Sequence, residues 1–580
     1  MVKPLLRAVR EYKRPSILAP IIVSLEVVAE CLIPFFTADL IKAIEDNKGI
    51  PTVLKYGFIL LAMALLSLTF GVLAGYFCSV AACGFAKNLR HDLFARIGTY
   101  SFANIDKFST SSLVTRLTTD VANVQNAYMM IIRTAIRCPF MLIFAFIMSI
   151  RLGGSLAWIF AGIIPVLGFA LFYIIGKVMP LFRHVFKKYD KLNESVQENI
   201  VGMRVVKTFV RQEHEIGKFN RASEDVRNDF TRAEKILAFN NPVMQLCIYT
   251  ALILISYFCS KIVISQFGVT HMHVGTLSSM LTYSMQIMMS MMMVSMVFVM
   301  ITMAAESARR ISEVLTEEST LQNPKDPITA VADGSVDFEN VSFKYSEKAE
   351  RNALSDIDLH IASGETIGII GGTGSSKTSL VNLISRLYDA TEGRVCVGGH
   401  DVREYDLETL RNSVAVVLQK NVLFSGTIKE NLRWGNPAAS DEELVAACRL
   451  AQADEFISAF PDGYDTYIEQ GGSNVSGGQK QRLCIARALL KKPKILILDD
   501  STSAVDTRTD ALIRRAMREE IPGMTKIIIA QRTSSVQDAD RIVVMENGQI
   551  ESCGTHAELL EKSPIYREVY ESQTKAGGDE

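Results

Sequence analysis

The sequence lacks a dense basic tract, and no segment interleaves basic with aromatic residues. Its 580 residues carry 61 lysines and arginines against 62 aspartates and glutamates, a formal net charge of −1. Proteins that bind nucleic acid normally concentrate positive charge on one surface. The balanced charge therefore argues against nucleic acid as the main partner.

Closely spaced cysteines are also missing. The 10 cysteines are scattered, with no CxxC pair and no cluster of cysteine and histidine. A disulfide framework or a zinc site would need such spacing. We therefore expect buried, reduced thiols.

A cleavable secretory signal is absent from the start of the sequence. The segment MVKPLLRAVREYKRPS is basic and weakly apolar, and no small-residue cleavage site follows it before the first long apolar run. We expect this segment to lie along the inner surface of a membrane.

Length and hydropathy divide the chain into two parts. At 580 residues it exceeds the size at which one hydrophobic core stops growing, so at least two domains are expected. Long apolar stretches end near residue 305, and from about residue 334 short β-like runs alternate with charged helical segments. We predict a transmembrane domain over 1–318, a linker over 319–333, a soluble α/β domain over 334–572 and a polar tail over 573–580.

Six stretches of the first part are long enough to cross a bilayer as helices, since a hydrocarbon layer of about 30 Å needs about 20 residues. They fall roughly at 16–41, 54–85, 127–150, 155–180, 238–265 and 274–304. Lysine and arginine are concentrated in the N-terminal segment and in two long loops, about 86–126 and 181–237, and are sparse in the short turns. The N-terminus, both long loops and the soluble domain are therefore predicted to be cytoplasmic.

Both long loops keep a helical period. Unstructured loops of this length are uncommon, so we expect the spans to continue as helices beyond the membrane. Their tips should contact another part of the protein.

Two acidic residues fall inside the first predicted span. Glu26 and Glu30 lie one turn apart on one helical face, although a charge at mid-membrane costs at least about 2.5–3.5 kcal/mol on insertion scales. They would either bind a cationic substrate or pair with Arg133 or Arg137 of the third span. The sequence favours neither alternative.

The sixth predicted span is rich in methionine, whose flexible side chain suits a surface that accepts several shapes. Ordinary helix packing is the expected role of most of them. They are Met280, Met285, Met288, Met289, Met291, Met292, Met293, Met296, Met300 and Met303.

The second part contains a phosphate-binding pattern of the GxxxxGK[ST] type. The sequence GGTGSSKT follows the strand-like run ETIGII and precedes a predicted helix beginning SLVNLISRL. Backbone N–H groups of such a loop converge on phosphate oxygens at a helix N-terminus. Lys377 should reach the β and γ phosphates of ATP, and Thr378 and Asp499 should hold Mg²⁺. The predicted loop contacts are Gly371, Gly372, Thr373, Gly374, Ser375, Ser376, Lys377, Thr378 and Ser379.

A further motif carries a family resemblance. NVSGGQ, followed by KQRLCIARALL, resembles the signature sequence of ABC ATPases, and the six-span part resembles type IV ABC exporters, so the resemblance covers almost the whole chain. It implies a six-span helical transmembrane domain with long intracellular helical loops, followed by an α/β P-loop ABC nucleotide-binding domain. Segments around 107–116 and 208–216 match coupling helices that would rest on the ATPase domains.

The same resemblance assigns roles to further residues. Gln419 matches the glutamine that senses the γ-phosphate and Mg²⁺, and Tyr345 matches the aromatic residue that stacks on adenine. The run Ser503 to Asp506 matches the loop that crosses to a partner domain. In this family two ATPase domains close head to tail, so a second half-transporter chain is implied. The nucleotide bound by that second chain would contact the signature residues of this chain, which are Ser476, Gly477, Gly478 and Gln479.

The phosphate-binding site departs from the family pattern. Ser376 replaces the last glycine of the loop, Asp500 stands where glutamate is expected, and Gln531 stands where histidine is usual. Asp500 is one methylene shorter than glutamate, which withdraws its carboxylate from the attacking water by more than about 1 Å. A misplacement of that size costs about 10²-fold in rate. Gln531 cannot carry a histidine's proton. Gln470 also replaces a common glutamate, whereas the signature changes only its leading leucine, to Val475.

These features together predict an ABC-type ATPase and translocase of the plasma membrane. The chain would be one subunit of a heterodimeric exporter of hydrophobic or amphipathic, drug-like compounds. It would bind ATP and Mg²⁺ at a weakly hydrolytic site and lend its signature to the partner's site. A homodimer with two slow sites, a nucleotide-gated channel or regulator, and lipid, peptide or siderophore substrates remain alternatives.

Overall fold

The computed structural model describes residues 2–265, 273–346, 349–501 and 504–576. The chain forms two compact units. The first, Met1–Gly98 with Ser109–Glu317, is helical, and the second, Thr99–Phe108 with Glu318–Glu580, contains the β-sheets. A ten-residue segment of the first long loop thus belongs to the sheet-containing unit.

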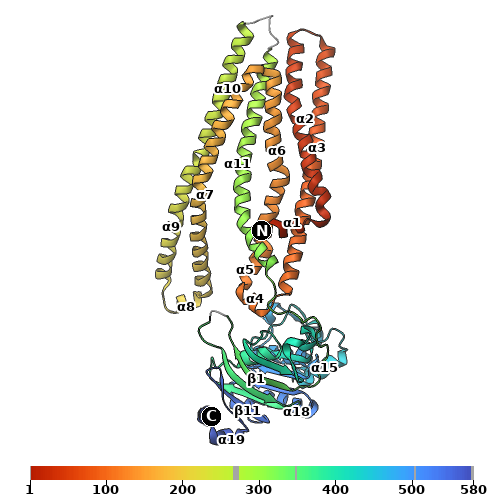
Figure 1. Cartoon of the computed structure of the whole chain (residues 1–580), viewed down its shortest axis with the longest axis vertical. Coiled ribbons are helices and arrows are strands. Elements are labelled where there is room, and N and C mark those ends of the chain that lie inside the picture. The colour runs from red at the N-terminus through yellow and green to blue at the C-terminus, as the bar shows by residue number, and fades with distance from the viewer. Residues whose placement is uncertain (1, 266–272, 347–348, 502–503, 577–580) are drawn as a thin grey trace. The chain divides into compact units, whose positions relative to one another are not determined.

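Among the described residues, six long apolar helices lie in the first unit (Figure 1). They are α2 (Lys13–Glu45), α3 (Ile50–Gly98), α6 (Val121–Gly153), α7 (Trp158–Val201), α10 (Asn240–Ser265) and α11 (Val274–Thr316). The described residues contain five continuous helical stretches apolar enough to cross a membrane, and the third, Thr110–Phe182, holds α6 and the first part of α7. The six predicted spans therefore each correspond to one of these helices. The predicted short turn at 266–273 lies outside the described residues except for His273.

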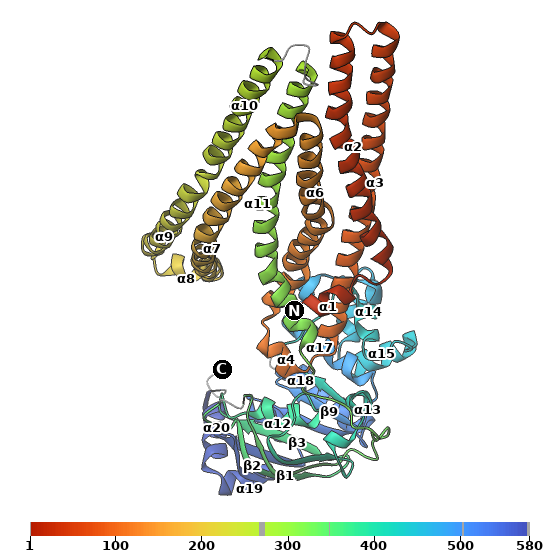
Figure 2. The same cartoon turned by 45° about the horizontal axis from the view of Figure 1, so that its top comes forward.

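The helices form two groups within this unit. Helix α9 (Gln212–Ala238) continues into α10, and α7 lies alongside both, while α2 packs along α3 (Figure 2). The N-terminal helix α1 (Val2–Arg7) leads into a buried stretch, where Asn88 of α3 donates a hydrogen bond of 3.0 Å to the carbonyl of Ala8. The two long loops are helical, as predicted.

Short helices form the tips of these loops. Helix α4 (Phe102–Lys107) and α5 (Thr110–Thr115) lie in the first, and α8 (Met203–Thr208) lies in the second. Of the segments that the resemblance matches to coupling helices, 107–116 contains the whole of α5, whereas 208–216 begins at Thr208, the last residue of α8. A capping box in which Ser101 and Asn104 bond reciprocally starts α4, and this S-x-x-N pattern marks its beginning better than helical period does.

The acidic pair of the first span is bound to one arginine. Nη1 of Arg137 lies 2.5 Å from Oε1 of Glu26, and Nη2 lies 2.6 Å from Oε2 of Glu30. Glu26 is buried between helices, and a β-carbon at Gly71 would lie 3.3 Å from its Oε1. Of the two alternatives left by the sequence, the structure contains the pairing with Arg137.

Two main sheets form the second unit. The antiparallel sheet has the order β2 (Leu354–Ile361), β1 (Val336–Phe343), β4 (Glu392–Val397) and β5 (His400–Asp401). The larger sheet has the order β12 (Gln549–Gly554), β11 (Arg541–Glu546), β3 (Thr366–Gly371), β10 (Thr525–Ile529), β9 (Ile495–Asp499) and β6 (Val414–Val417). Its strands from β11 to β6 are parallel. A small hairpin pairs β7 (Gly426–Thr427) with β8 (Tyr467–Ile468).

The larger sheet is buried on both faces. All five residues of β9 and of β10 are buried, which explains their continuous apolar runs. The surrounding helices are α12 (Lys377–Ile384), α13 (Leu407–Ser413), α14 (Ile428–Arg433), α15 (Asp441–Leu450), α16 (Asp454–Ser458), α17 (Gly477–Leu489), α18 (Thr507–Glu520), α19 (His556–Lys562) and α20 (Pro564–Ala576). The carboxyl ends of parallel strands meet at one edge, where ligands of such sheets bind.

Candidate nucleotide-binding site

The phosphate-binding pattern forms the turn between β3 and α12. Gly371 ends the strand, and a β-carbon there would lie 2.3 Å from the carbonyl oxygen of Met545, so no larger residue fits. Gly374 adopts φ +86°, and nothing lies within 4 Å of where its β-carbon would be. The loop therefore has the backbone freedom and open space that a bound phosphate group needs.

Ser376 occupies the strained position of this loop. Its φ of 68° and ψ of 24° are left-handed, and it is the residue immediately before α12. A left-handed conformation costs an ordinary residue roughly 1–2 kcal/mol, whereas glycine adopts it freely. Glycine at this position would avoid the strain that Ser376 bears.

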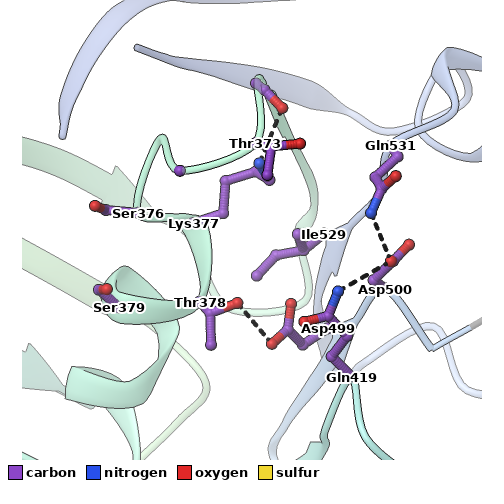
Figure 3. Close-up of a pocket in the computed structure, with 12 residues that line it drawn as sticks. Thr373, Ser376, Lys377, Thr378, Ser379, Gln419, Asp499, Asp500, Ile529 and Gln531 are labelled. Atoms are coloured by element: carbon purple, nitrogen blue, oxygen red, sulfur yellow. Dashed lines mark hydrogen bonds between the residues drawn. The ribbon is translucent and has the colours of Figure 1, made fainter. Parts of the chain in front are cut away.

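A pocket of about 310 Å³ opens beside the loop (Figure 3). It brings together residues from the carboxyl ends of β3, β6, β9 and β10, which are neighbours in the parallel part of the sheet. The lining residues are Gly371, Thr373, Gly374, Ser376, Lys377, Thr378, Ser379, Gln419, Asp499, Asp500, Ile529 and Gln531. Of the predicted loop residues, Gly372 and Ser375 do not line it. Ile529, which the sequence analysis missed, is the last residue of β10.

Lys377 folds over the loop. Its Nζ donates hydrogen bonds to the carbonyl oxygens of Gly371 at 2.9 Å and Gly372 at 2.8 Å, and to Oγ of Ser375 at 3.1 Å. Burial lowers the pKa of Lys377, and the charges of Asp499 and Asp500 oppose that shift. Among the described residues, the ammonium has only neutral acceptors in hydrogen-bonding contact, so an anionic phosphate group would be a stronger partner.

Thr378 and Asp499 form a pair of oxygen ligands. The hydroxyl of Thr378 donates a hydrogen bond of 2.9 Å to Oδ2 of Asp499, whose side chain is 2% exposed. Burial raises the pKa of Asp499. The described residues contain no group of three histidine, cysteine or acidic side chains suited to a metal. A hydroxyl and a carboxylate nevertheless fit Mg²⁺, which binds through one or two carboxylates and takes its other ligands from water and phosphate.

Two amides bind the carboxylate of Asp500. Nε2 of Gln531 donates to Oδ2 of Asp500 at 2.9 Å, and Nε2 of Gln419 lies 3.4 Å from the same oxygen (Figure 3). Asp500 itself is left-handed, with φ 46°, and its backbone N–H donates to the carbonyl of Ile529. The carboxylate is therefore fixed at the rim of the pocket by residues from two other strand ends.

Tyr345 lies beside the phosphate loop. Its hydroxyl and Oγ of Ser379 are 2.8 Å apart, and its ring packs edge to face against Tyr388, with centroids 5.2 Å apart. Tyr388 in turn donates a hydrogen bond of 2.7 Å to Asp106 of α4, and burial together with Asp106 raises the pKa of Tyr388. Sequence reasoning missed Tyr388, whose only signal is an aromatic residue shortly after α12.

The signature residues form the start of α17. Ser476 caps this helix, and Gln479 completes a capping box by accepting from the backbone N–H of Ser476 at 2.9 Å. A β-carbon at Gly478 would lie 2.9 Å from the carbonyl oxygen of Ala504, in the predicted crossing loop. Ser503 of that loop lies outside the described residues. None of the four signature residues, all of them described, lines the pocket.

Comparison with known proteins decides the family. Residues 16–291 match the model of the ABC transporter transmembrane region, and residues 354–503 match the ABC transporter model. The uncharacterized ABC transporter ATP-binding protein YfiB of Bacillus subtilis is 35% identical over 563 residues, 97% of each chain. The chain belongs to the ABC transporter family. An uncharacterized ABC transporter ATP-binding protein of Mycobacterium tuberculosis is 34% identical over 580 residues, 99% of this chain and 98% of the relative.

The fold has a counterpart among solved structures. A bacterial Atm1-family ABC exporter with ATP bound superposes with a TM-score of 0.82 at 24% identity, covering 97% of this chain and 98% of that one. As an ABC transporter, the chain couples a membrane domain to an ATPase domain of a type that binds ATP with Mg²⁺. The resemblance stated from the sequence is therefore confirmed at the level of family and fold.

Proposed function

We propose that the chain is one half of a heterodimeric ATP-driven exporter whose own site holds ATP and hydrolyses it slowly. The observation that carries the proposal is the position of Asp500. Asp500 directly follows β9, at the position from which a general base would act on the attacking water. Its side chain is one methylene shorter than that of the expected glutamate. Two amides, from Gln531 and Gln419, already bind its carboxylate.

Slow hydrolysis follows from the chemistry of these contacts. A base must reach the proton that it removes to within about 2.6–3.2 Å. Hydrogen bonds from two amides occupy Oδ2 of Asp500, an oxygen that would otherwise be available to accept the proton of the attacking water. Gln531 donates a hydrogen bond but has no proton to exchange near neutral pH, unlike histidine.

ATP binding is supported by the rest of the pocket. Lys377 would exchange its neutral acceptors for the β and γ phosphates, and Thr378 and Asp499 would hold Mg²⁺. The metal supplies charge neutralisation for the phosphates when it is bound. Gln419 would sense the γ-phosphate, and Tyr345 would stack on adenine after leaving Ser379.

The signature would serve a different nucleotide. Ser476, Gly477, Gly478 and Gln479 stand apart from the chain's own pocket, at the N-terminus of a 13-residue helix whose N–H groups favour an anion. Placed against the phosphate loop of a partner chain, they would complete the partner's hydrolytic site. The chain thus combines a weak site of its own with an intact contribution to another.

Transport would follow from closure of the two ATPase domains. Helix α4 lies in the same compact unit as the sheets and would transmit closure to the spans, which switch from inward-facing to outward-facing. We place the transporter in the plasma membrane with its N-terminus and ATPase domain in the cytoplasm. Its substrates would be hydrophobic or amphipathic compounds, because exposed methionines of α11 offer an adaptable apolar surface.

Mass measurement tests the heterodimer. The tagged chain, of 64.3 kDa, is purified from native membranes and the intact complex is weighed by native mass spectrometry. A complex of two different chains is expected. A complex of twice the mass of this chain supports a homodimer with two slow sites instead, an alternative favoured by the fact that Asp500 still lines the pocket.

A further inference from the structure

The segment that carries Gln531 lies beyond the end of its strand. Strand β10 ends at Ile529, and the side chains of Gln531 and Arg532 are exposed. Segments outside a sheet are more mobile than the strands that they follow. Gln531 nevertheless donates its hydrogen bond of 2.9 Å to Asp500 (Figure 3). A side chain aimed so closely from such a segment needs a backbone that is held by something other than the sheet.

Gln573 of α20 holds this backbone on both sides of Arg532. Its Nε2 donates a hydrogen bond of 2.8 Å to the carbonyl oxygen of Gln531. Its Oε1 accepts from the backbone N–H of Thr533 at 2.8 Å and from the hydroxyl of Thr533 at 3.0 Å. Arg532 between them is extended, with φ −96° and ψ 129°. The amide thus pairs with one C=O and one N–H, as a neighbouring strand would where the sheet has ended.

Helix α20 is itself firmly attached to the domain. Tyr566 in its first turn is fully buried, and its hydroxyl lies 2.7 Å from Nδ1 of His556. The next residue, Arg567, donates a hydrogen bond of 2.6 Å to the carbonyl of Leu560 in α19. Gln573 follows Tyr566 by two helical turns and so lies on the same face of the helix. The buried tyrosine therefore fixes the place from which Gln573 reaches the segment.

We propose that Gln573 is a positioning residue of the ATP site and acts through Gln531. By fixing the backbone around Arg532, it aims the amide of Gln531 at Oδ2 of Asp500. Gln573 does not itself line the pocket. The inference rests on the proposed function, in which the contact between Gln531 and Asp500 slows hydrolysis. The rate of the site would thus depend on a side chain of α20 that lies outside the pocket.

The two ends of the Gln573 amide allow positioning to be separated from simple attachment of α20. Oε1 binds Thr533, which is 3% exposed, and this contact alone would fasten the helix. Nε2 binds the carbonyl of Gln531, and only this contact acts directly on the residue at the site. Gln573→Glu keeps the length and the accepting oxygen, but it replaces the donor by an oxygen that repels a carbonyl. Gln573→Ala removes both contacts.

Amide hydrogen exchange tests the contact without nucleotide. The full chain in nanodiscs is compared with its variants, and exchange is followed in peptides that contain Thr533. Gln573→Ala should speed exchange of the Thr533 N–H, whereas Gln573→Glu should leave it slow. Thr574→Ala is the matched control, because the hydroxyl of Thr574 bonds to the carbonyl of Tyr570 within α20. Exchange at Thr533 that is the same in Gln573→Ala as in the natural chain overturns the inference.

Hydrolysis of ATP in a single turnover, with the chain in excess, tests the effect on the site. Gln573→Ala and Gln573→Glu should both speed hydrolysis about two- to ten-fold, the factor that one hydrogen bond is worth, because Gln531 then leaves Oδ2 of Asp500. In a Gln531→Ala background neither should change the rate, since nothing is left to position. A natural rate in Gln573→Glu, or an effect of Gln573→Ala that persists without Gln531, overturns the inference.

Gln531→Ala alone separates this inference from the proposed function. If it speeds hydrolysis while both Gln573 variants keep the natural rate, the positioning role is wrong and the proposed function stands. If Gln531→Ala and Gln573→Ala both slow hydrolysis, and the double variant is no slower than Gln531→Ala, Gln573 still acts through Gln531. The contact with Asp500 is then not the cause of slow hydrolysis, and the proposed function is wrong.

Discussion

Gln531 donates a hydrogen bond of 2.9 Å to the carboxylate of Asp500. These are two of the positions at which we predicted a departure from the family pattern, and they touch each other. Gln419 lies 3.4 Å from the same carboxylate oxygen. The departures therefore form one contact, and changes at the two positions should not act independently.

Restoring both residues should accelerate hydrolysis more than restoring either. Asp500→Glu lengthens the carboxylate toward the attacking water, but Gln531 would still bind it, so we expect a gain below about 10²-fold. The double variant with Gln531→His should exceed the product of the two single gains. Phosphate release at steady state measures this, with Asp500→Asn as a control that should be slower than the natural chain. Multiplicative gains would contradict the coupling.

Ser376→Gly should stabilise the nucleotide-binding domain. Glycine removes the left-handed strain of about 1 kcal/mol but increases the entropy of the unfolded chain, so the net gain is expected to be below about 1 kcal/mol, or a Tm rise of about 2–4 °C at most. ATP should then bind more tightly. Ser376→Ala keeps a β-carbon and should give neither effect. Thermal unfolding with and without ATP measures both, and an equal gain from Ala would contradict the strain argument.

Mg²⁺-dependent binding should weaken as pH falls. Burial raises the pKa of Asp499, so this carboxylate takes up a proton at a higher pH than the ordinary value of about 3.9. Without metal, the contribution of Asp499 to the free energy of unfolding is present at low pH and is lost as pH rises through its folded-state pKa. Bound Mg²⁺ favours the ionised form of Asp499, whereas burial without the metal favours the protonated form.

The test is ATP affinity with Mg²⁺ and with EDTA between about pH 8 and about pH 5. In the natural chain, the difference between the ATP affinity with Mg²⁺ and that with EDTA should shrink toward low pH. In Asp499→Asn it should be small throughout. A difference that persists unchanged at low pH would show that Asp499 does not hold the metal.

Arg137→Gln should destabilise the membrane domain. It leaves Glu26 and Glu30 without their cation, and an uncompensated buried charge costs about 3–5 kcal/mol, less here because Glu30 and Arg137 are partly exposed. Arg133→Gln, one turn earlier on α6, is the matched control, because Arg133 forms no ion pair among the described residues. Melting in detergent compares them. Adding Glu26→Gln to Arg137→Gln should recover part of the loss.

Sequence predicted the parts of the site that are local. The phosphate loop, the end of β9 and the signature each carry their spacing within a few residues. The sequence therefore identified Asp499 and the loop from Gly371 to Ser379, of which all but Gly372 and Ser375 line the pocket. The contact between Tyr388 and Asp106 joins residues 282 positions apart and has no local signal. Ile529 was missed because nothing in an apolar strand marks which residue faces a ligand.

In the membrane domain, too, the sequence predicted local features but not contacts between distant residues. Hydropathy located the spans, because a bilayer imposes length and apolarity on each helix separately. Arg133 and Arg137 lie four residues apart on one face of α6, so periodicity could not select between them, and only packing against α2 did. At the loop tips the segment 107–116 contains α5, but 208–216 begins only where α8 ends, because six-residue helices are too short to establish a period.

Turnover and trapping of ATP by the purified full chain test the central claim most directly. The natural chain is compared in nanodiscs with the triple variant Ser376→Gly, Asp500→Glu, Gln531→His. The account predicts that the natural chain retains unhydrolysed ATP with barely detectable turnover, and that the triple variant turns it over at least about 10²-fold faster. Rapid turnover by the natural chain alone would contradict a weakly hydrolytic site and a division of labour between two different halves.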